Sequence, residues 1–218
     1  MRFYFSLALI AVAFSVASAV TPQELADYVA AVTKNSRPAA KDALTDFAEL
    51  VTESNFASLG FASLEEVKDA ELGQPLPVAM VRLDELQKYK DGDDPYALVH
   101  PSHRVVYPVL VKGQVRSGIE LHEKDGKWLA TTFGLANSVK LYAQARQKHA
   151  DQPGNTPYFL VKALALNEFY LAHLKGKELR LIRVRDQAAS EHKLEGHSAA
   201  QLFVELAKKA KEHDGSNR

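Results

Sequence analysis

The sequence has no cysteine among its 218 residues. That absence excludes disulfide bonds, thiolate metal ligands, cysteine nucleophiles and lipids attached through cysteine. An excess of charge of one sign is also absent, because Lys plus Arg and Asp plus Glu each number 27. Since no global field then attracts nucleic acid or an anionic membrane, we expect no nucleic-acid partner.

A long hydrophobic run occurs only at the N-terminus. Arg2 precedes a stretch, Phe3–Val16, that is apolar apart from two serines. Ala17-Ser18-Ala19 then has the small-x-small form that signal peptidase requires. We therefore predict a cleaved signal peptide over residues 1–19 and no membrane span after cleavage. An uncleaved anchor or a buried helix is the alternative.

Two further absences bear on the compartment. The sequence lacks cysteine, and none of its asparagines begins an Asn-x-Ser/Thr glycosylation site. Both features favour a bacterial periplasmic or secreted protein over a eukaryotic secretory one. The expected localisation is therefore exported, either periplasmic or secreted.

Alternating residues and turn signals predict an antiparallel meander in the middle of the chain. Lys112-Gly113 and Asp125-Gly126 are tight-turn signals, because glycine accepts the positive φ that such turns require. The three strands are expected over Arg104–Val111, Gln114–Glu123 and Lys127–Phe133, and a helix over Leu135–Ala150. A weaker echo follows, with strands over Tyr158–Leu164, Asn167–Leu174 and Glu178–Arg185 and a closing helix over Ser198–Glu212.

Helix signals dominate the region before the meander. Thr21-Pro22-Gln23-Glu24 is a capping box with proline at the first helical position. Asn35-Ser36-Arg37-Pro38 is expected to break this helix and open another, so the sequence predicts a helical pair over residues 21–53. A short strand is expected over Pro77–Leu83.

These elements predict an α+β fold: an antiparallel meander sheet with helices packed on one side, preceded by the helical pair. We expect a single domain over residues 20–213, with the sheet-and-helix body over 56–213 and a disordered tail over 214–218. Two β-β-β-α subdomains that meet at residues 151–157 are the alternative.

Several short motifs resemble a pattern that recurs in exported bacterial α+β proteins of no assigned function. The pattern covers Phe56–Gly134, and its turn and core residues imply a shared fold without implying a catalytic residue. The motifs are Leu72-Gly73-Gln74-Pro75-Leu76-Pro77-Val78, Tyr107-Pro108-Val109-Leu110-Val111, Gly126-Lys127-Trp128 and Phe133-Gly134.

The candidate chemistry is sparse. His100 and His103 are spaced so that they could share a metal, but they stand in a predicted loop and no HExxH motif is present. Asp91-Gly92-Asp93-Asp94 begins like a calcium loop and then departs from it at Pro95. Ser117 lacks the Gly-x-Ser-x-Gly context of a nucleophile elbow. We therefore expect no metal and no cofactor, and we assign no catalytic residue.

A polar face of the central strand is the candidate binding site. Arg116, Glu120 and His122 alternate with apolar residues along Gln114–Glu123, and a sheet face of this kind can hold a ligand or a partner. The sequence thus favours a non-catalytic module that binds a protein or a small ligand. A hydrolase with a scattered Ser/His/Asp site and a protease inhibitor or propeptide-like protein are the alternatives. Trp128 is expected to be mostly buried against a helix.

Overall fold

The computed structural model describes residues 19–148, 157–184 and 196–213. It contains four α-helices: α1 Pro22–Leu50, α2 Leu83–Leu86, α3 Ala136–Lys148 and α4 Ala199–Glu212. Three short 3-10 helices, η1 Glu65–Asp69, η2 Pro95–Leu98 and η3 Leu164–Leu166, lie in connections. Within these ranges no helix combines the length and the apolar character that a membrane crossing requires.

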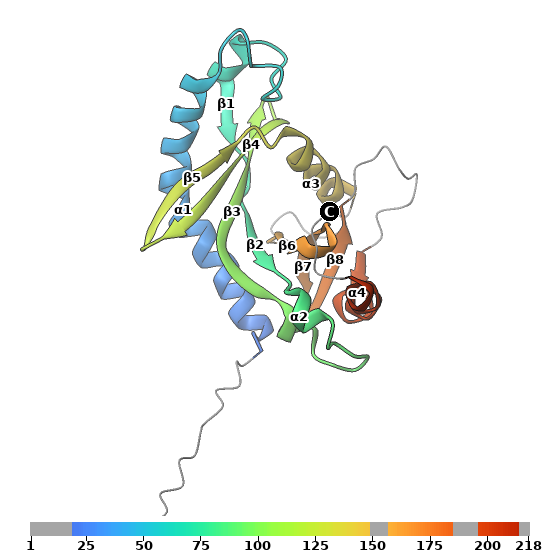
Figure 1. The fold of residues 1–218 in the computed structure, drawn as a ribbon. Helices are drawn as coiled ribbons and strands as arrows, with labels where there is room; N and C mark the ends of the chain where they lie inside the picture. Colours follow the sequence, from blue (N-terminus) through green and yellow to red (C-terminus); the bar gives the residue numbers. More distant parts are fainter. Residues whose placement is uncertain (1–18, 149–156, 185–195, 214–218) are drawn as a thin grey trace, which may run out of the picture.

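Nine strands form one sheet (Figure 1). The strands are β1 Ala70–Leu72, β2 Leu76–Met80, β3 His100–Val111, β4 Gln114–Lys124, β5 Lys127–Phe133, β6 Phe159–Ala163, β7 Glu168–Lys175, β8 Glu178–Arg183 and β9 Gly196–Ser198. Their order is β5-β4-β3-β2-β6-β7-β8-β9, and β1 adds to β3 beside this path. Every pair is antiparallel except β2 with β6. The predicted α+β class and the central meander are confirmed.

The N-terminal helical pair was a wrong prediction, because residues 22–50 form the single helix α1 with Pro38 inside it. The capping box at Thr21 and Glu24 is present as expected. Near the proline, Ser36 Oγ donates to the carbonyl of Val32 at 2.6 Å and shares a hydrogen bond of 2.9 Å with Tyr107 Oη on β3. This contact with the sheet supports the helix close to the point where Pro38 supplies no N–H.

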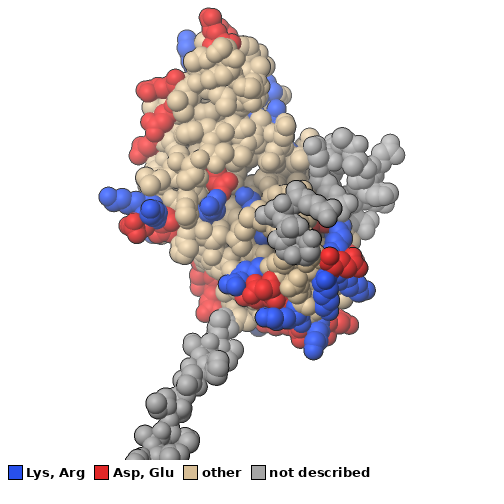
Figure 2. Space-filling model, in the orientation of Figure 1, with Lys and Arg blue, Asp and Glu red and all other residues tan. Residues whose placement is uncertain are grey.

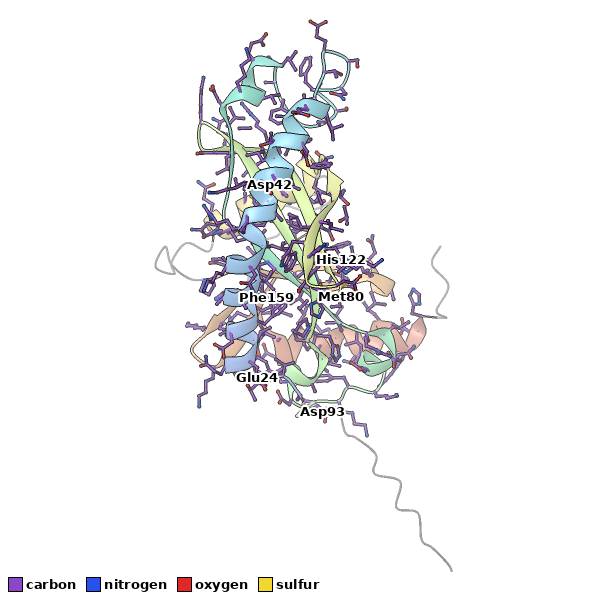
Figure 3. The ribbon with its side chains drawn as sticks, turned by 90° about the vertical axis from the view of Figure 1, so that its left-hand side faces the viewer. Glu24, Asp42, Met80, Asp93, His122 and Phe159 are labelled. Atoms are coloured by element: carbon purple, nitrogen blue, oxygen red, sulfur yellow. The ribbon has the colours of Figure 1, made fainter. Side chains whose placement is uncertain are left out.

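The long helix runs over the sheet with its lower end near Glu24 and Asp42 further along (Figure 3). Its buried residues recur every three or four positions along the whole length, so one stripe faces the sheet. They are Leu25, Val29, Val32, Ser36, Ala40, Ala43 and Phe47. Figure 1 also shows α1 changing direction partway along its length.

Helices cover both faces of the sheet. On the face that we call the α1 face, Val105 and Ile119 pack with α1, and Phe159 and Tyr170 pack with α1 and α4. On the opposite face, the α3 face, Val139 and other buried residues of α3 pack against the sheet. The sheet residues there are Leu76, Val78, Val106, Leu160, Leu171 and Ile182. The prediction of helices on one side therefore holds for α1 and α4, whereas α3 lies on the other.

The two halves of the sheet repeat one pattern about the parallel pair β2–β6. Strands β2, β3, β4 and β5 lead to α3, and strands β6, β7, β8 and β9 lead to α4. The strand order is mirrored about the centre, the central strands are parallel, and the two helices lie on opposite faces. A half-turn about an axis along the strands produces this arrangement. The predicted repeat of strands followed by a helix is therefore present as two related halves of one continuous sheet.

Some predictions fall outside the described residues. They concern the signal peptide apart from Ala19, the boundary at 151–157 apart from Pro157, and the tail at 214–218. The single-domain organisation stays a prediction.

Candidate functional site

A β-bulge in β4 sets the positions of the predicted face residues. Val109 pairs with Ser117 and Leu110 with Val115, so Arg116 is the extra residue of the bulge. Its guanidinium lies 2.8 Å from Glu66 of η1. Arg116 therefore forms an ion pair with a carboxylate of η1, an element that precedes the meander in the sequence.

Glu120 and His122 lie on the α3 face. The register places His122 beside Arg104, and Arg104 beside Val78, whose side chain packs on the α3 face. Figure 3 labels His122 on the strand that carries it. The structure thus brings Glu120 and His122 to one face, with Arg104 as their neighbour from β3.

Glu120 is the centre of a polar cluster that joins three strands. Its side chain is only 10% exposed, and it lies 3.0 Å from the guanidinium of Arg104 and 3.8 Å from the amine of Lys162. Lys162 comes from β6 and reaches across the sheet to β4. We call Glu120, Arg104 and Lys162 the polar cluster. With both cations charged and Glu120 ionised, the cluster carries one surplus positive charge.

Burial dominates the electrostatics around the cluster. Removal from water lowers the pKa of Lys162, and the nearby Glu120 opposes that shift. Burial also raises the pKa of Tyr142 on α3 to about 12, with a further contribution from Glu120. The cluster therefore lies at the edge of a poorly hydrated region under α3, where hydrogen bonds and charges act more strongly than in water.

A groove of about 440 Å³ lies between α3 and the start of β7. Phe169, one of its lining residues, pairs in register with Lys162, so the groove borders the polar cluster. Both polar and apolar residues line this α3 groove. They are Asn137, Ser138, Leu141, Tyr142, Leu166, Asn167, Glu168, Phe169 and Val184. Figure 2 shows a largely uncharged surface over β3–β5 with one small group of acidic and basic atoms in its middle.

This arrangement can bind a polar ligand. Glu120 lies between the cations of Arg104 and Lys162. Arg104 remains 46% exposed and keeps donors for a ligand after pairing with Glu120. The site therefore offers fixed hydrogen-bond donors and a surplus positive charge next to a concave surface.

The two histidines of the metal hypothesis point to separate carboxylates. His100 contacts Glu85, and His103 Nδ1 lies 3.2 Å from Glu123. Across the described ranges, no group of three or more His, Asp or Glu side chains could hold a metal ion. Asp93 and Asp94 accept hydrogen bonds from the nearby backbone at Lys90 and Tyr96, as in a local turn.

The segment around His103 instead shapes the sheet. Ala79 pairs with Pro101 and Val78 with Arg104, so Ser102 and His103 bulge out of β3. His103 has φ 53°, an uncommon left-handed conformation for a residue other than glycine. The carbonyl of Val78 accepts hydrogen bonds from Tyr28 Oη and Ser102 Oγ, both at 2.7 Å. This segment therefore ties α1 to the sheet.

Ser117 does not have the surroundings of a nucleophile. It is completely buried, and its Oγ makes no hydrogen bond within the described structure. An activated serine needs a base within hydrogen-bond reach, so this residue does not support a hydrolase.

Sequence reasoning missed Lys162, Arg104 as a partner of Glu120, and the α3 groove. The signal for Lys162 was present, because it is the one charged residue in the apolar strand Phe159–Ala163. A lysine among buried apolar residues needs either a route to water or a carboxylate. The identity of that carboxylate depends on the parallel pairing of β2 with β6.

Comparisons with other proteins give no further guide to this site. No family model, no curated protein and no solved structure matches the chain. The α3 groove and the polar cluster therefore provide the basis for a functional conclusion.

Proposed function

We propose that this protein is an exported, non-catalytic binding module that holds a small polar ligand in the α3 groove. The observation that carries the proposal is a concave space of about 440 Å³ beside a cluster of charged residues, of which Glu120 and Lys162 are largely buried and Arg104 is exposed. Small-ligand sites in proteins commonly measure roughly 300–1,000 Å³ and combine apolar walls with a few fixed polar groups. Export rests on the signal peptide that the sequence predicts over residues 1–19.

The charge balance indicates the kind of ligand. Arg104 and Lys162 outnumber Glu120 in the polar cluster, and Asn137 and Ser138 add amide and hydroxyl groups at the rim. A compact molecule rich in oxygen acceptors, such as a hydroxy acid or a sugar acid, complements these groups. The concave shape favours such a molecule over the flat surface of a protein partner.

An NMR titration tests this function. ¹⁵N-labelled protein is titrated with a panel of hydroxy acids and sugar acids, and we expect saturable shift changes at Ser138, Asn167 and Phe169. Ser138→Trp fills the groove and should abolish these changes. Gln147→Trp is the matched control, because Gln147 is exposed on the same helix and does not line the α3 groove.

Three results would contradict the proposal. One is the absence of any shift change across the panel, and another is equal binding by Ser138→Trp and the unmodified protein. The third is turnover of generic ester or peptide substrates that one Ser or His substitution abolishes, which would favour the hydrolase. Inhibition of an exported protease without ligand binding would favour an inhibitor.

A further inference from the structure

A second cavity lies on the other side of α3. It has a volume of about 260 Å³ and is bounded by the β1–β2 connection, β3, β4 and α3. The lining residues are mainly apolar: Gly73, Gln74, Leu76, Pro108, Leu110, Val115, Tyr142, Ala143 and Arg146. We call this cavity the Arg146 pocket, and it shares only Tyr142 with the α3 groove.

Close backbone packing builds one wall of the pocket. The N–H of Gly73 donates to the carbonyl of Pro108 at 2.8 Å. A side chain at position 73 would bring its Cβ to 3.2 Å from Pro108 Cβ, which is tighter than ordinary contact. Glycine therefore lets the β1–β2 connection lie flat against β3, and the wall beside Leu110 stays apolar.

Arg146 supplies the one cationic group in this apolar lining. Its guanidinium donates to the side-chain oxygen of Gln74 and lies 5.2 Å from the ring centre of Tyr158. Among the described residues, no carboxylate forms an ion pair with it. Burial lowers the pKa of Arg146, with the nearby Tyr158 opposing the shift. A half-buried guanidinium whose described neighbours are all neutral retains a strong attraction for an anion.

We propose that the Arg146 pocket binds a small hydrophobic carboxylate. The hydrocarbon part occupies the apolar walls, and the carboxylate accepts two hydrogen bonds from Arg146 in place of the Gln74 side chain. The volume of 260 Å³ lies just under the roughly 300 Å³ at which drug-sized sites begin. A medium-chain fatty acid such as octanoate therefore fits better than a long-chain lipid. This site is independent of the proposed function in the α3 groove.

Calorimetric titration with octanoate tests the pocket on the purified full chain. We expect saturable octanoate binding that weakens about tenfold or more in Arg146→Gln, because hydrogen bonds to charged groups are the strong ones. Octanol has the same chain without the charge. It should therefore bind more weakly than octanoate, and with equal affinity to the unmodified protein and to Arg146→Gln. Ala143→Phe fills the pocket and should abolish the binding of both probes.

The controls show whether a loss of octanoate binding comes from a folding defect, and whether octanoate binds in the Arg146 pocket or in the α3 groove. Gln147→Ala, at an exposed position on the same helix, should bind octanoate normally, and thermal unfolding shows whether each variant is folded. Ser138→Trp, which blocks the α3 groove, should leave octanoate binding unchanged. The inference is overturned if octanoate does not bind, if octylamine binds as tightly, or if folded Arg146→Gln retains full octanoate affinity.

Discussion

Glu168 is a second buried carboxylate, and it joins α4 to the sheet. Its oxygens lie 2.9 Å from Lys209 Nζ on α4 and 3.2 Å from Arg183 Nε on β8. Tyr170 Oη also donates to it at 3.2 Å. The contact with Lys209 links the closing helix directly to β7, so the charge of Glu168 bears on the stability of that junction.

The pKa of Glu168 predicts a pH dependence of stability. Burial pushes the pKa up, but the hydrogen bond from Lys209 and the charge of Arg183 outweigh it and leave the pKa below 4.5. A carboxyl whose folded-state pKa is depressed stabilises the fold above its unfolded pKa. That contribution is lost as the pH falls through the folded value.

We therefore expect Glu168→Gln to lower the free energy of unfolding at pH 7 by about 1–3 kcal/mol. The difference from the unmodified protein should shrink as the pH falls below 4.5. Urea denaturation across the pH range measures both effects. Glu178→Gln is the control, since the exposed pair of Glu178 with Arg180 should contribute little. Parallel pH profiles for Glu168→Gln and the unmodified protein would contradict this account.

Part of the candidate site could be read from single residues in the sequence. Alternation in β4 predicted one shared face for Glu120 and His122, and the structure places that face on the α3 side of the sheet. It could not foresee the bulge that takes Arg116 to Glu66, because a bulge of this kind has no local sequence signal here. Trp128 was expected to be mostly buried, and it is half-buried beside the residues that pack under α1. Its size predicted a core contact but not the edge position of β5.

The helix α1 shows how tertiary packing overrides a local signal. Pro38 alone argues for a break, since it removes one backbone hydrogen bond and crowds the preceding turn. The buried stripe nevertheless continues across it, from Ser36 to Ala40 and on to Phe47. An unbroken buried stripe that spans a proline is the signal for one continuous helix.

Replacing Pro38 by alanine should stabilise the protein. Position 38 is exposed, and an alanine N–H there can donate to the carbonyl one turn earlier. We expect an increase in unfolding free energy of up to about 3 kcal/mol, measured by chemical denaturation. Lys41→Ala, at another exposed position of α1, should change stability little. A loss of stability in Pro38→Ala would mean that the change of direction in α1 is fitted to the curvature of the sheet.

At the scale of the whole molecule, the cores connect the two halves of the chain. The α3 face combines Leu76 and Val106 with Leu160 and Ile182, and the α1 face combines Leu25 with Phe203. Because neither half completes these clusters alone, we expect a single cooperative unfolding transition.

Two probes can measure that cooperativity. Trp128, the one tryptophan, reports on the first half by fluorescence, while far-UV circular dichroism reports on all helices and strands. The midpoints of urea unfolding should coincide. Separate midpoints, or two stable fragments from limited proteolysis between Asp151 and Pro157, would instead support two β-β-β-α subdomains.

The sequence predicted the fold class because β-hairpins have local sequence signals. Lys112-Gly113 and Asp125-Gly126 both turn with positive φ between strands that alternate. The parallel pairing of β2 with β6 has no such signal, because the two strands are far apart in sequence. The contact between Lys162 and Glu120 depends on that pairing, because it brings β6 into the sheet beside β2.

The parallel pair β2–β6 also sets the order in which a growing chain can finish its fold. Four of the five residues of β2 are buried, and its β6 edge stays open until residues 159–163 have been synthesised. An open apolar strand edge is a template for joining other chains, and distant pairings form late. A nascent chain that stops between β5 and β6 would thus have a complete meander, and the edge of β2 would be free to pair with another chain. Completing the native sheet must wait for the last third of translation.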